Sequence, residues 1–171
     1  MDYKIIVSEE DRNNDHIVNA LMKQGVTVEK VRRLLIGDYL VQVGTLTVPV
    51  QIKRLNSYED FLNTLLDENL NVNGVNEFIK RLDRAKQNNT KVVLLIEDDS
   101  FYSKLFLEEN NIKDKVLKLE ALYPNLNIVA IDKNFTGQYI YSTLYLRLME
   151  FCKKNESIVG NSNYKISILH I

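Results

Sequence analysis

Residues 26–53 have the sequence VTVEKVRRLLIGDYLVQVGTLTVPVQIK, in which β-branched residues dominate and Gly37-Asp38 and Gly44 interrupt the pattern. Such a pattern is typical of strands separated by tight turns. It predicts three consecutive strands: 26–35, 39–43 and 46–53. Pro49 lies inside the last of these strands. Because proline has no N–H to donate to a neighbouring strand, it indicates an edge position or a bulge there.

The flanking sequence alternates between short apolar runs and segments with helical periodicity. Lys91–Glu97 contains a continuous apolar run, which is typical of a strand covered on both faces. Helical spacing and helix-start signals predict helices between the strands. The expected strands outside the first stretch are 3–7, 91–97 and 126–131, and the expected helices are 11–24, one starting near Ser57, 75–87, 101–108, 113–122 and 135–153. This alternation predicts an α/β three-layer sandwich with a mixed central sheet flanked by helices.

The bulk composition bounds the class of protein. A chain of 171 residues is long enough for one domain, which we place at residues 1–154. A C-terminal tail, 155–171, follows; its first part, 155–163, is polar, and residues 164–171 can add one more strand. The formal net charge is −1, so any contact with nucleic acid depends on local basic patches. Cys152 is the single cysteine, which excludes a disulfide framework, and no apolar run is long enough for a membrane helix. A cytoplasmic protein without membrane contact is expected.

Asp38 and the triplet Gln51–Lys53 carry the strongest chemical signal. Asp38 opens the strand 39–43, and the triplet ends the strand that returns beside it, so the two are expected at one end of the sheet. Alternation along a strand places the Gln51 and Lys53 side chains on the same face, and leaves Ile52 to offer its backbone carbonyl. Oxygen donors beside a lysine are what metal-dependent phosphodiester hydrolysis requires. Alone, this pattern is weak, because a Gly-Asp turn and a lysine near a strand end are both common.

Three blocks of the chain together resemble a known family. They are IIVSEEDRNNDHIVNALMKQGVTVEKVRRLLIGDYLV from Ile5, TVPVQIKR from Thr47, and RLDRAKQNNTKVVLLIED from Arg81. The chain resembles the XPF-type nuclease domain, a branch of the PD-(D/E)xK superfamily with a restriction-endonuclease-like fold. The GDY block is the most specific element, and the segment FTGQYIYSTLYLRLMEF resembles the last helix of small phage and bacterial members that lack a helix-hairpin-helix domain.

The resemblance implies an endonuclease that uses Mg²⁺ or Mn²⁺ to cut DNA, with branched or forked DNA as the substrate, in a bacterial or phage-infected cell. In this interpretation Asp38, Gln51 and the Ile52 carbonyl hold the metal, and Lys53 orients the attacking water or stabilises the developing charge. Glu10 is the accessory acid, with Glu9 and Asp11 as alternatives. Backbone phosphates would be held by four arginines: Arg33, Arg54, Arg81 and Arg84.

The chain also departs from the family pattern. Ser8 stands where the family has an aspartate at the end of the first strand, Gln51 replaces the glutamate of the ERK triplet, and Ile52 replaces its arginine. An amide oxygen can bind a hard cation but lacks the charge of a carboxylate. Gln51 is either a natural residue or an engineered substitution. The alternative function is therefore a catalytically inactive XPF-like domain that binds DNA or a partner protein.

Other features of the sequence favour structural roles or exclude further classes of enzyme. Glu97, Asp98 and Asp99 follow a buried strand, and capping of a helix beginning at Asp99 or Ser100 is their expected role. No serine or cysteine lies in a nucleophile motif, and no glycine-rich phosphate loop follows a strand. The apolar surface of the last helix, from Tyr141 to Cys152, predicts either deep burial or a subunit contact. The latter would support a homodimer or pairing with a related subunit.

Overall fold

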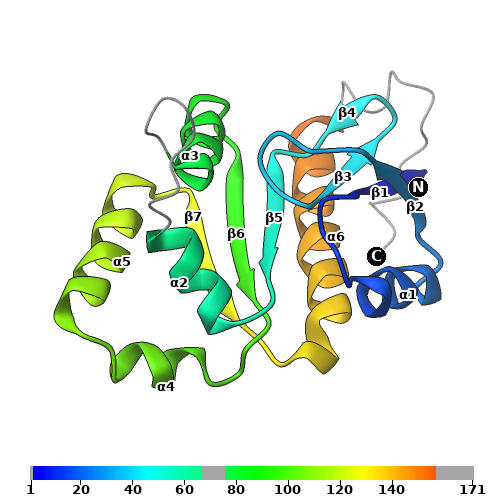
Figure 1. The fold of residues 1–171 in the computed structure, drawn as a ribbon. Coiled ribbons are helices and arrows are strands. Elements are labelled where there is room, and N and C mark those ends of the chain that lie inside the picture. The colour runs from blue at the N-terminus through cyan, green and yellow to red at the C-terminus, as the bar shows by residue number, and fades with distance from the viewer. Residues whose placement is uncertain (1, 67–75, 157–171) are drawn as a thin grey trace. The chain divides into compact units, whose positions relative to one another are not determined.

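A computed structural model describes residues 2–66 and 76–156 of the chain. The chain forms two compact units (Figure 1). Unit 1 comprises Met1–Leu34, Asp38–Val50 and Thr136–Ile171, and unit 2 comprises Leu35–Gly37 and Gln51–Phe135. We describe each unit by itself.

Unit 1 is built on a small mixed sheet. Its strands are β1 (Tyr3–Ser8), β2 (Thr27–Val31), β3 (Tyr39–Val43) and β4 (Leu46–Thr47). The order is β2-β1-β3, and β4 pairs with β3. β1 runs parallel to β2 and antiparallel to β3, so both strand directions occur in the same sheet. Helix α1 (Asp15–Lys23) makes the connection between the two parallel strands.

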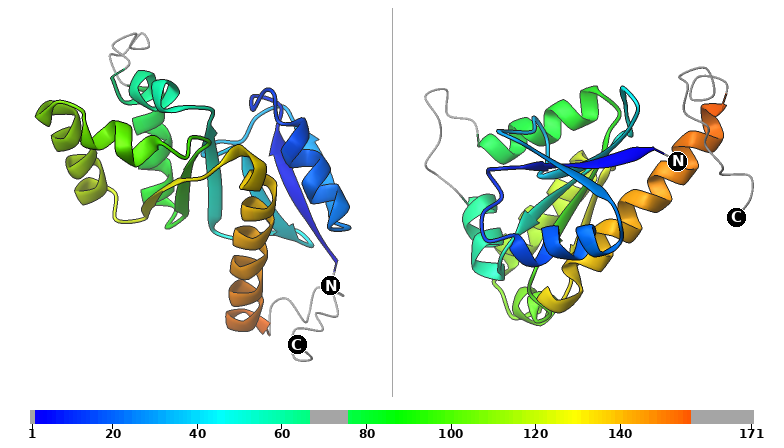
Figure 2. Two further views of the ribbon diagram at one scale, coloured as in Figure 1. Left: turned by 90° about the horizontal axis from the view of Figure 1, so that it is seen from below. Right: turned by 90° about the vertical axis from the view of Figure 1, so that its right-hand side faces the viewer.

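Helices α1 and α6 (Thr136–Lys154) pack against each other in unit 1 (Figure 2). Ile17 and Leu21 of α1 and Leu144 of α6 are fully buried. A Cβ atom added at Gly137 would lie 2.4 Å from the Ala20 Cβ, so glycine permits this close approach. Most of the expected apolar face of α6 is therefore used inside the unit. A dimer formed through this helix stays a prediction.

Unit 2 carries the strands β5 (Val50–Leu55), β6 (Lys91–Ile96) and β7 (Leu126–Ala130), in the order β5-β6-β7. β6 and β7 are parallel. The flanking helices are α2 (Tyr58–Leu66), α3 (Glu77–Gln87), α4 (Phe101–Phe106) and α5 (Asn110–Leu122), with a short 3₁₀ turn at Lys133–Phe135. Helix α3 begins where the Asn76 side chain accepts hydrogen bonds from the Phe78 and Ile79 amides.

The core of unit 2 lies between its strands and helices. Val92 through Ile96 are all buried, which confirms that this apolar run is a strand covered on both faces. Phe61 of α2 and Phe101 of α4 meet edge to face, with ring centroids 5.0 Å apart. Burial of this surface is the main source of stability for the unit.

The observed elements follow the sequence prediction, with two differences within residues 26–53. The expected strand 46–53 is two strands, β4 and β5, which are separated at Val48-Pro49. Pro49 has no N–H to donate to a neighbouring strand, so the strand is interrupted there and a new strand begins at Val50. The first strand of the stretch ends at Val31 rather than at residue 35. The strand expected at 164–171 lies outside the described residues, and no described helix has the length and apolarity that crossing a membrane would require.

Candidate functional site

The residues singled out from the sequence divide between the two units. Glu10, Arg33 and Asp38 belong to unit 1. The others belong to unit 2: Gln51, Ile52, Lys53, Arg54, Arg81 and Arg84. Each group is positioned by contacts within its own unit.

Asp38 in unit 1 directly precedes β3 and is fully buried. Its backbone carbonyl accepts a hydrogen bond of 2.8 Å from the amide of Ser8, the last residue of β1. Ser8 is also fully buried, and its hydroxyl oxygen accepts the Glu10 amide at 3.2 Å. The two positions that the family resemblance marks as acidic are thus joined by a backbone hydrogen bond, one at the end of β1 and one just before β3, and a serine occupies the first.

The acidic residues after Ser8 have partners of their own. Glu10 is exposed, and its carboxylate lies 3.4 Å from the Arg33 Nε. Asp11 accepts a hydrogen bond from the Tyr39 hydroxyl, which in turn accepts one from the Asn14 amide group at 3.3 Å. Asp11 therefore anchors the tyrosine of the GDY block. Glu10 and Arg33 remain at the surface, where an accessory acid and a phosphate contact would have to lie.

Gln51 of β5 is buried, and its side-chain oxygen accepts the Gly37 amide at 2.9 Å. Gly37 also lies against the backbone of the same strand. A Cβ atom at Gly37 would be 2.8 Å from the Ile52 carbonyl oxygen and 3.0 Å from the Gln51 Cβ. The glycine of the GDY block thus rests on the first two residues of the QxK triplet. Lys53, the third, is half-buried.

Replacing Gly37 with alanine is expected to lower the free energy of unfolding by about 1–3 kcal/mol, because the added methyl group would overlap atoms of β5 that cannot rotate away. Urea unfolding followed by circular dichroism measures the change. An unfolding midpoint equal to that of the original chain would contradict this packing.

The side chain of Arg54 is buried, whereas a phosphate-binding arginine would be exposed. Its guanidinium forms a buried ion pair with Glu97, and each side chain is 2% exposed. Arg54 also donates to the side chain of Asn56. The prediction that Arg54 contacts a phosphate is therefore wrong. Side chains alternate along β5, so the side chain of Arg54 lies on the opposite face from that of Lys53 and is buried. Glu97, expected to serve as a helix cap, is its partner.

Arg81 and Arg84 of α3 bond to backbone carbonyls. Arg81 donates to the Ile36 carbonyl oxygen at 3.3 Å, and Arg84 donates to the Leu35 carbonyl oxygen at 2.9 Å. Arg81 is buried, and its Nε lies 3.7 Å from the Glu77 carboxylate. Arg81 therefore has partners within the protein and lacks the exposure that a phosphate contact requires. Arg84 is half-buried.

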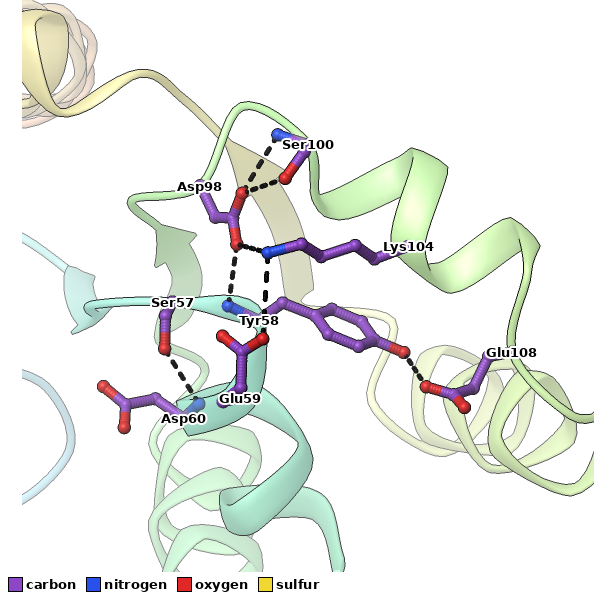
Figure 3. Close-up of polar contacts among 8 residues, drawn as sticks. All are labelled: Ser57, Tyr58, Glu59, Asp60, Asp98, Ser100, Lys104 and Glu108. Carbon is purple, nitrogen blue, oxygen red and sulfur yellow. Dashed lines mark hydrogen bonds and ion pairs between the residues drawn. The ribbon is translucent and has the colours of Figure 1, made fainter.

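A second polar cluster in unit 2 surrounds Asp98 (Figure 3). The Asp98 carboxylate accepts hydrogen bonds from the Ser100 amide and hydroxyl, from the Tyr58 amide at 3.1 Å and from the Lys104 ammonium at 2.9 Å. The hydroxyl of Ser100 and then the Lys104 ammonium hold the pKa of Asp98 well below its usual range. Asp98 therefore joins the first residue of α2 to Ser100, the residue before α4. The Ser100 side chain makes no cap hydrogen bond to α4, and Glu97 pairs with Arg54, so the capping of this helix expected for the acidic cluster is not observed.

Sequence reasoning did not find the other members of this cluster. Lys104 also lies 3.8 Å from Glu59, and the Tyr58 hydroxyl donates to Glu108. Burial, followed by this hydrogen bond, raises the pKa of Tyr58. The available signal was Asp98 two residues before Ser100, a spacing that favours a local turn. Every polar group of Asp98 is used inside the unit, so we read the cluster as structural.

The metal-binding capacity of the candidate residues follows from their donor atoms. The Asp38 carboxylate, the Gln51 amide and the Ile52 carbonyl are oxygen donors, which is the type that Mg²⁺ and Mn²⁺ take, so the set fits in kind. The set carries little negative charge for a divalent cation, because only one of its three donors is a carboxylate. Within residues 2–66 and 76–156, no three His, Cys, Asp or Glu side chains gather closely enough to hold a metal ion. The assignment of Asp38, Gln51 and Ile52 as ligands stays a prediction.

Comparison with known proteins places this geometry in context. The model of one family, described as the ERCC4 domain, matches residues 7–143. No curated protein matches the chain. Among solved structures, XPF from Aeropyrum pernix matches with a TM-score of 0.61 and 18% identity over 84% of this chain. The same protein in complex with DNA matches with a TM-score of 0.61 and 17% identity over 86% of this chain.

The chain spans 66% of the length of each of these archaeal chains. At this level of identity the likeness is one of fold. It confirms the predicted α/β class, with a mixed sheet and flanking helices.

Proposed function

Because the chain belongs to the ERCC4-domain family of XPF-type nucleases, whose model matches residues 7–143, we propose that it is a metal-dependent endonuclease that cleaves branched or forked DNA. The family identity expected from the GDY, QxK and LLIE blocks is thereby confirmed. The substrate structure, the metal and the catalytic roles are proposed here.

One observation carries the proposal: Gly37 of the GDY block rests on Gln51 and Ile52 of the QxK triplet. Hydrolysis of a phosphodiester needs oxygen ligands and a cationic group that are brought to one place from separate parts of a chain. Asp38 follows Gly37 in the sequence, and Lys53 follows Ile52. The packing of Gly37 on β5 therefore supports an assignment of function to the two blocks together.

We assign the metal ligands to Asp38, Gln51 and the Ile52 carbonyl. A divalent ion bound by them would polarise the phosphate and lower the pKa of a bound water. Lys53 supplies a positive charge that stabilises the phosphate as negative charge develops on it. Arg33, whose side chain is 46% exposed beside Glu10 in unit 1, is the arginine of the expected set that we assign to a backbone phosphate.

DNA as the partner has independent support. One structure of the Aeropyrum pernix XPF that this chain resembles is a complex with DNA. The formal net charge of −1 means that the chain lacks an overall positive field, so affinity for DNA should come from local cations and fall steeply as salt rises.

A catalytically inactive, DNA-binding domain is the second candidate. Ser8 and Gln51 favour it, because both stand at positions where the family pattern has a carboxylate. Both are buried, and each accepts a hydrogen bond from a backbone amide, so each has a structural partner in the fold. Retention of Asp38 and Lys53 favours the active enzyme.

Cleavage of labelled duplex, flap and fork DNA with Mg²⁺, Mn²⁺ or a chelator tests the proposal. Replacing Lys53 with alanine is expected to lower the rate by roughly 100-fold, because one donor to the developing charge is lost. Lys91→Ala is the matched control, since Lys91 is an exposed lysine at the start of β6 in the same unit.

The outcomes separate the two candidates. Cutting that needs the metal and is lost in Lys53→Ala but not in Lys91→Ala supports the enzyme. Cutting in the presence of the chelator, or an unchanged rate for Lys53→Ala, contradicts the assigned roles. DNA binding without cutting in any condition supports the inactive domain.

A further inference from the structure

Three consecutive residues before Asp38 each bond to a polar side chain of unit 2. The Leu35 carbonyl accepts from Arg84 at 2.9 Å, the Ile36 carbonyl accepts from Arg81 at 3.3 Å, and the Gly37 amide donates to Gln51 at 2.9 Å. We call Gln51, Arg81 and Arg84 the backbone clamp. Its members come from two elements, β5 and α3, that are far apart in the sequence.

The clamp meets a need created by the local backbone. Leu34 through Asp38 belong to no helix or strand, so no regular ladder satisfies their amides and carbonyls. Ile36 and Gly37 are nevertheless buried. Because a buried backbone polar group without a partner costs free energy comparable to a lost hydrogen bond, side chains must supply the partners here.

The clamp also leaves little freedom to the segment that it holds. Gly37 lies close enough to β5 that a Cβ atom would reach to 2.8 Å from the Ile52 carbonyl oxygen. The Ile36 side chain is part of the buried core of unit 2. The bonds from Arg81 and Arg84 to the two residues before Gly37, together with the contact of Gly37 with β5, hold the peptide that leads into Asp38.

We propose that Gln51, Arg81 and Arg84 are positioning residues that set the backbone of Leu35–Gly37, the segment that presents Asp38, and that Arg81 and Arg84 do not bind phosphate. This inference rests on the proposed function for its effect on catalysis. Its structural part is independent of any activity. It also separates two tasks of Gln51: its oxygen accepts the Gly37 amide, whether or not the same oxygen binds a metal.

The direct test is hydrogen exchange of the Gly37 amide, measured by NMR on the ¹⁵N-labelled protein. Gln51→Met keeps the length of the side chain but removes the acceptor, so exchange is expected to become about tenfold faster. Gln51→Glu keeps an acceptor oxygen and should preserve protection. Equal protection in Gln51→Met and in the original chain would overturn the clamp.

The arginines are tested in the same way. Arg81→Ala and Arg84→Ala should each speed exchange at Gly37 by several-fold, and Arg81→Lys, which keeps a donor, should restore part of the protection. Lys80→Ala is the matched control, because it removes one positive charge from the same helix at a position outside the clamp. Faster exchange in Lys80→Ala as well would point to general loosening of α3 and overturn the specific role.

DNA binding distinguishes positioning from phosphate contact. For positioning residues, Arg81→Ala and Arg84→Ala lower kcat while the Kd for DNA and its salt dependence stay unchanged. Phosphate ligands would instead weaken binding and reduce the slope of log K against log salt by roughly 0.9 for each lost contact. Weaker DNA binding with a reduced salt slope, together with unchanged exchange of the Gly37 amide, overturns the inference. If no variant cuts DNA, the proposed function fails and the exchange data alone decide the clamp.

Discussion

Replacing Arg54 with alanine is expected to lower the free energy of unfolding by about 3–5 kcal/mol. Arg54 and Glu97 are each 2% exposed, and they form an ion pair in the interior of unit 2. Removing the arginine leaves the Glu97 carboxylate buried without its cationic partner. The penalty comes from that uncompensated charge more than from the attraction that is lost.

Urea unfolding followed by far-ultraviolet circular dichroism measures this change. Arg147→Ala is the control, because Arg147 pairs with Glu150 at 3.0 Å on the exposed side of α6. An exposed pair contributes about 0–1 kcal/mol, so this variant should unfold close to the original midpoint. Similar losses in the two variants would contradict the buried character of the Arg54 pair.

A second variant separates charge from packing. Changing both residues to apolar ones, Arg54→Met with Glu97→Leu, should recover most of the loss, since neither charge then remains in the core. If the double variant is as unstable as Arg54→Ala, the other contacts of these side chains, including the bond from Arg54 to Asn56, account for the effect.

The sequence predicted the order of helices and strands because alternation and helical spacing are local properties. The apolar run 91–97 and the helix start at Ser57 were both identified in this way, and the Ser57 hydroxyl accepts the Asp60 amide at 3.1 Å. Pro49 was recognised as unfavourable inside the predicted strand 46–53, but the sequence did not show that the strand is divided there. Whether a proline sits in an edge strand or ends a strand depends on the neighbouring strand, which the local sequence does not specify.

The partners of the charged residues were less predictable. Arg54, Arg81 and Arg84 look alike in the sequence, as cations within the blocks that resemble the family, yet the first pairs with Glu97 and the other two bond to backbone carbonyls. These partners are 43, 45 and 49 residues away in the chain. Buried charges are generally paired, but this rule predicts internal partners for the arginines only once their burial is known.

Gln51→Glu is expected to raise the affinity of the protein for Mn²⁺ on the order of 100-fold. By Coulomb's law a unit charge about 2 Å from a divalent ion gains roughly 4 kcal/mol even at the dielectric constant of water, and desolvation of the new carboxylate offsets part of this gain. Gln51 is 9% exposed, so the carboxylate that replaces it would be largely removed from water when no metal is bound.

This cost gives the prediction a second readout. Without metal, burial should raise the pKa of the new carboxyl group above its value in the unfolded chain. The variant should then be close in stability to the original chain below the unfolded-state pKa and lose stability as the pH rises through the raised pKa. Adding Mn²⁺ should reverse the loss of stability, because the ion neutralises the charge. Thermal unfolding at two pH values, with and without Mn²⁺, measures this without any cleavage assay.

Gln87→Glu is the matched control for the added charge, since Gln87 is exposed at the end of α3 in the same unit. Isothermal titration with Mn²⁺ should find tighter binding in Gln51→Glu and no change in Gln87→Glu, and cleavage should rise with the metal affinity. A gain in metal affinity without cleavage would locate the defect at Ser8, the other position where the family pattern has a carboxylate. No gain in affinity would mean that the Gln51 position does not face a metal, and the inactive DNA-binding domain would become the better account.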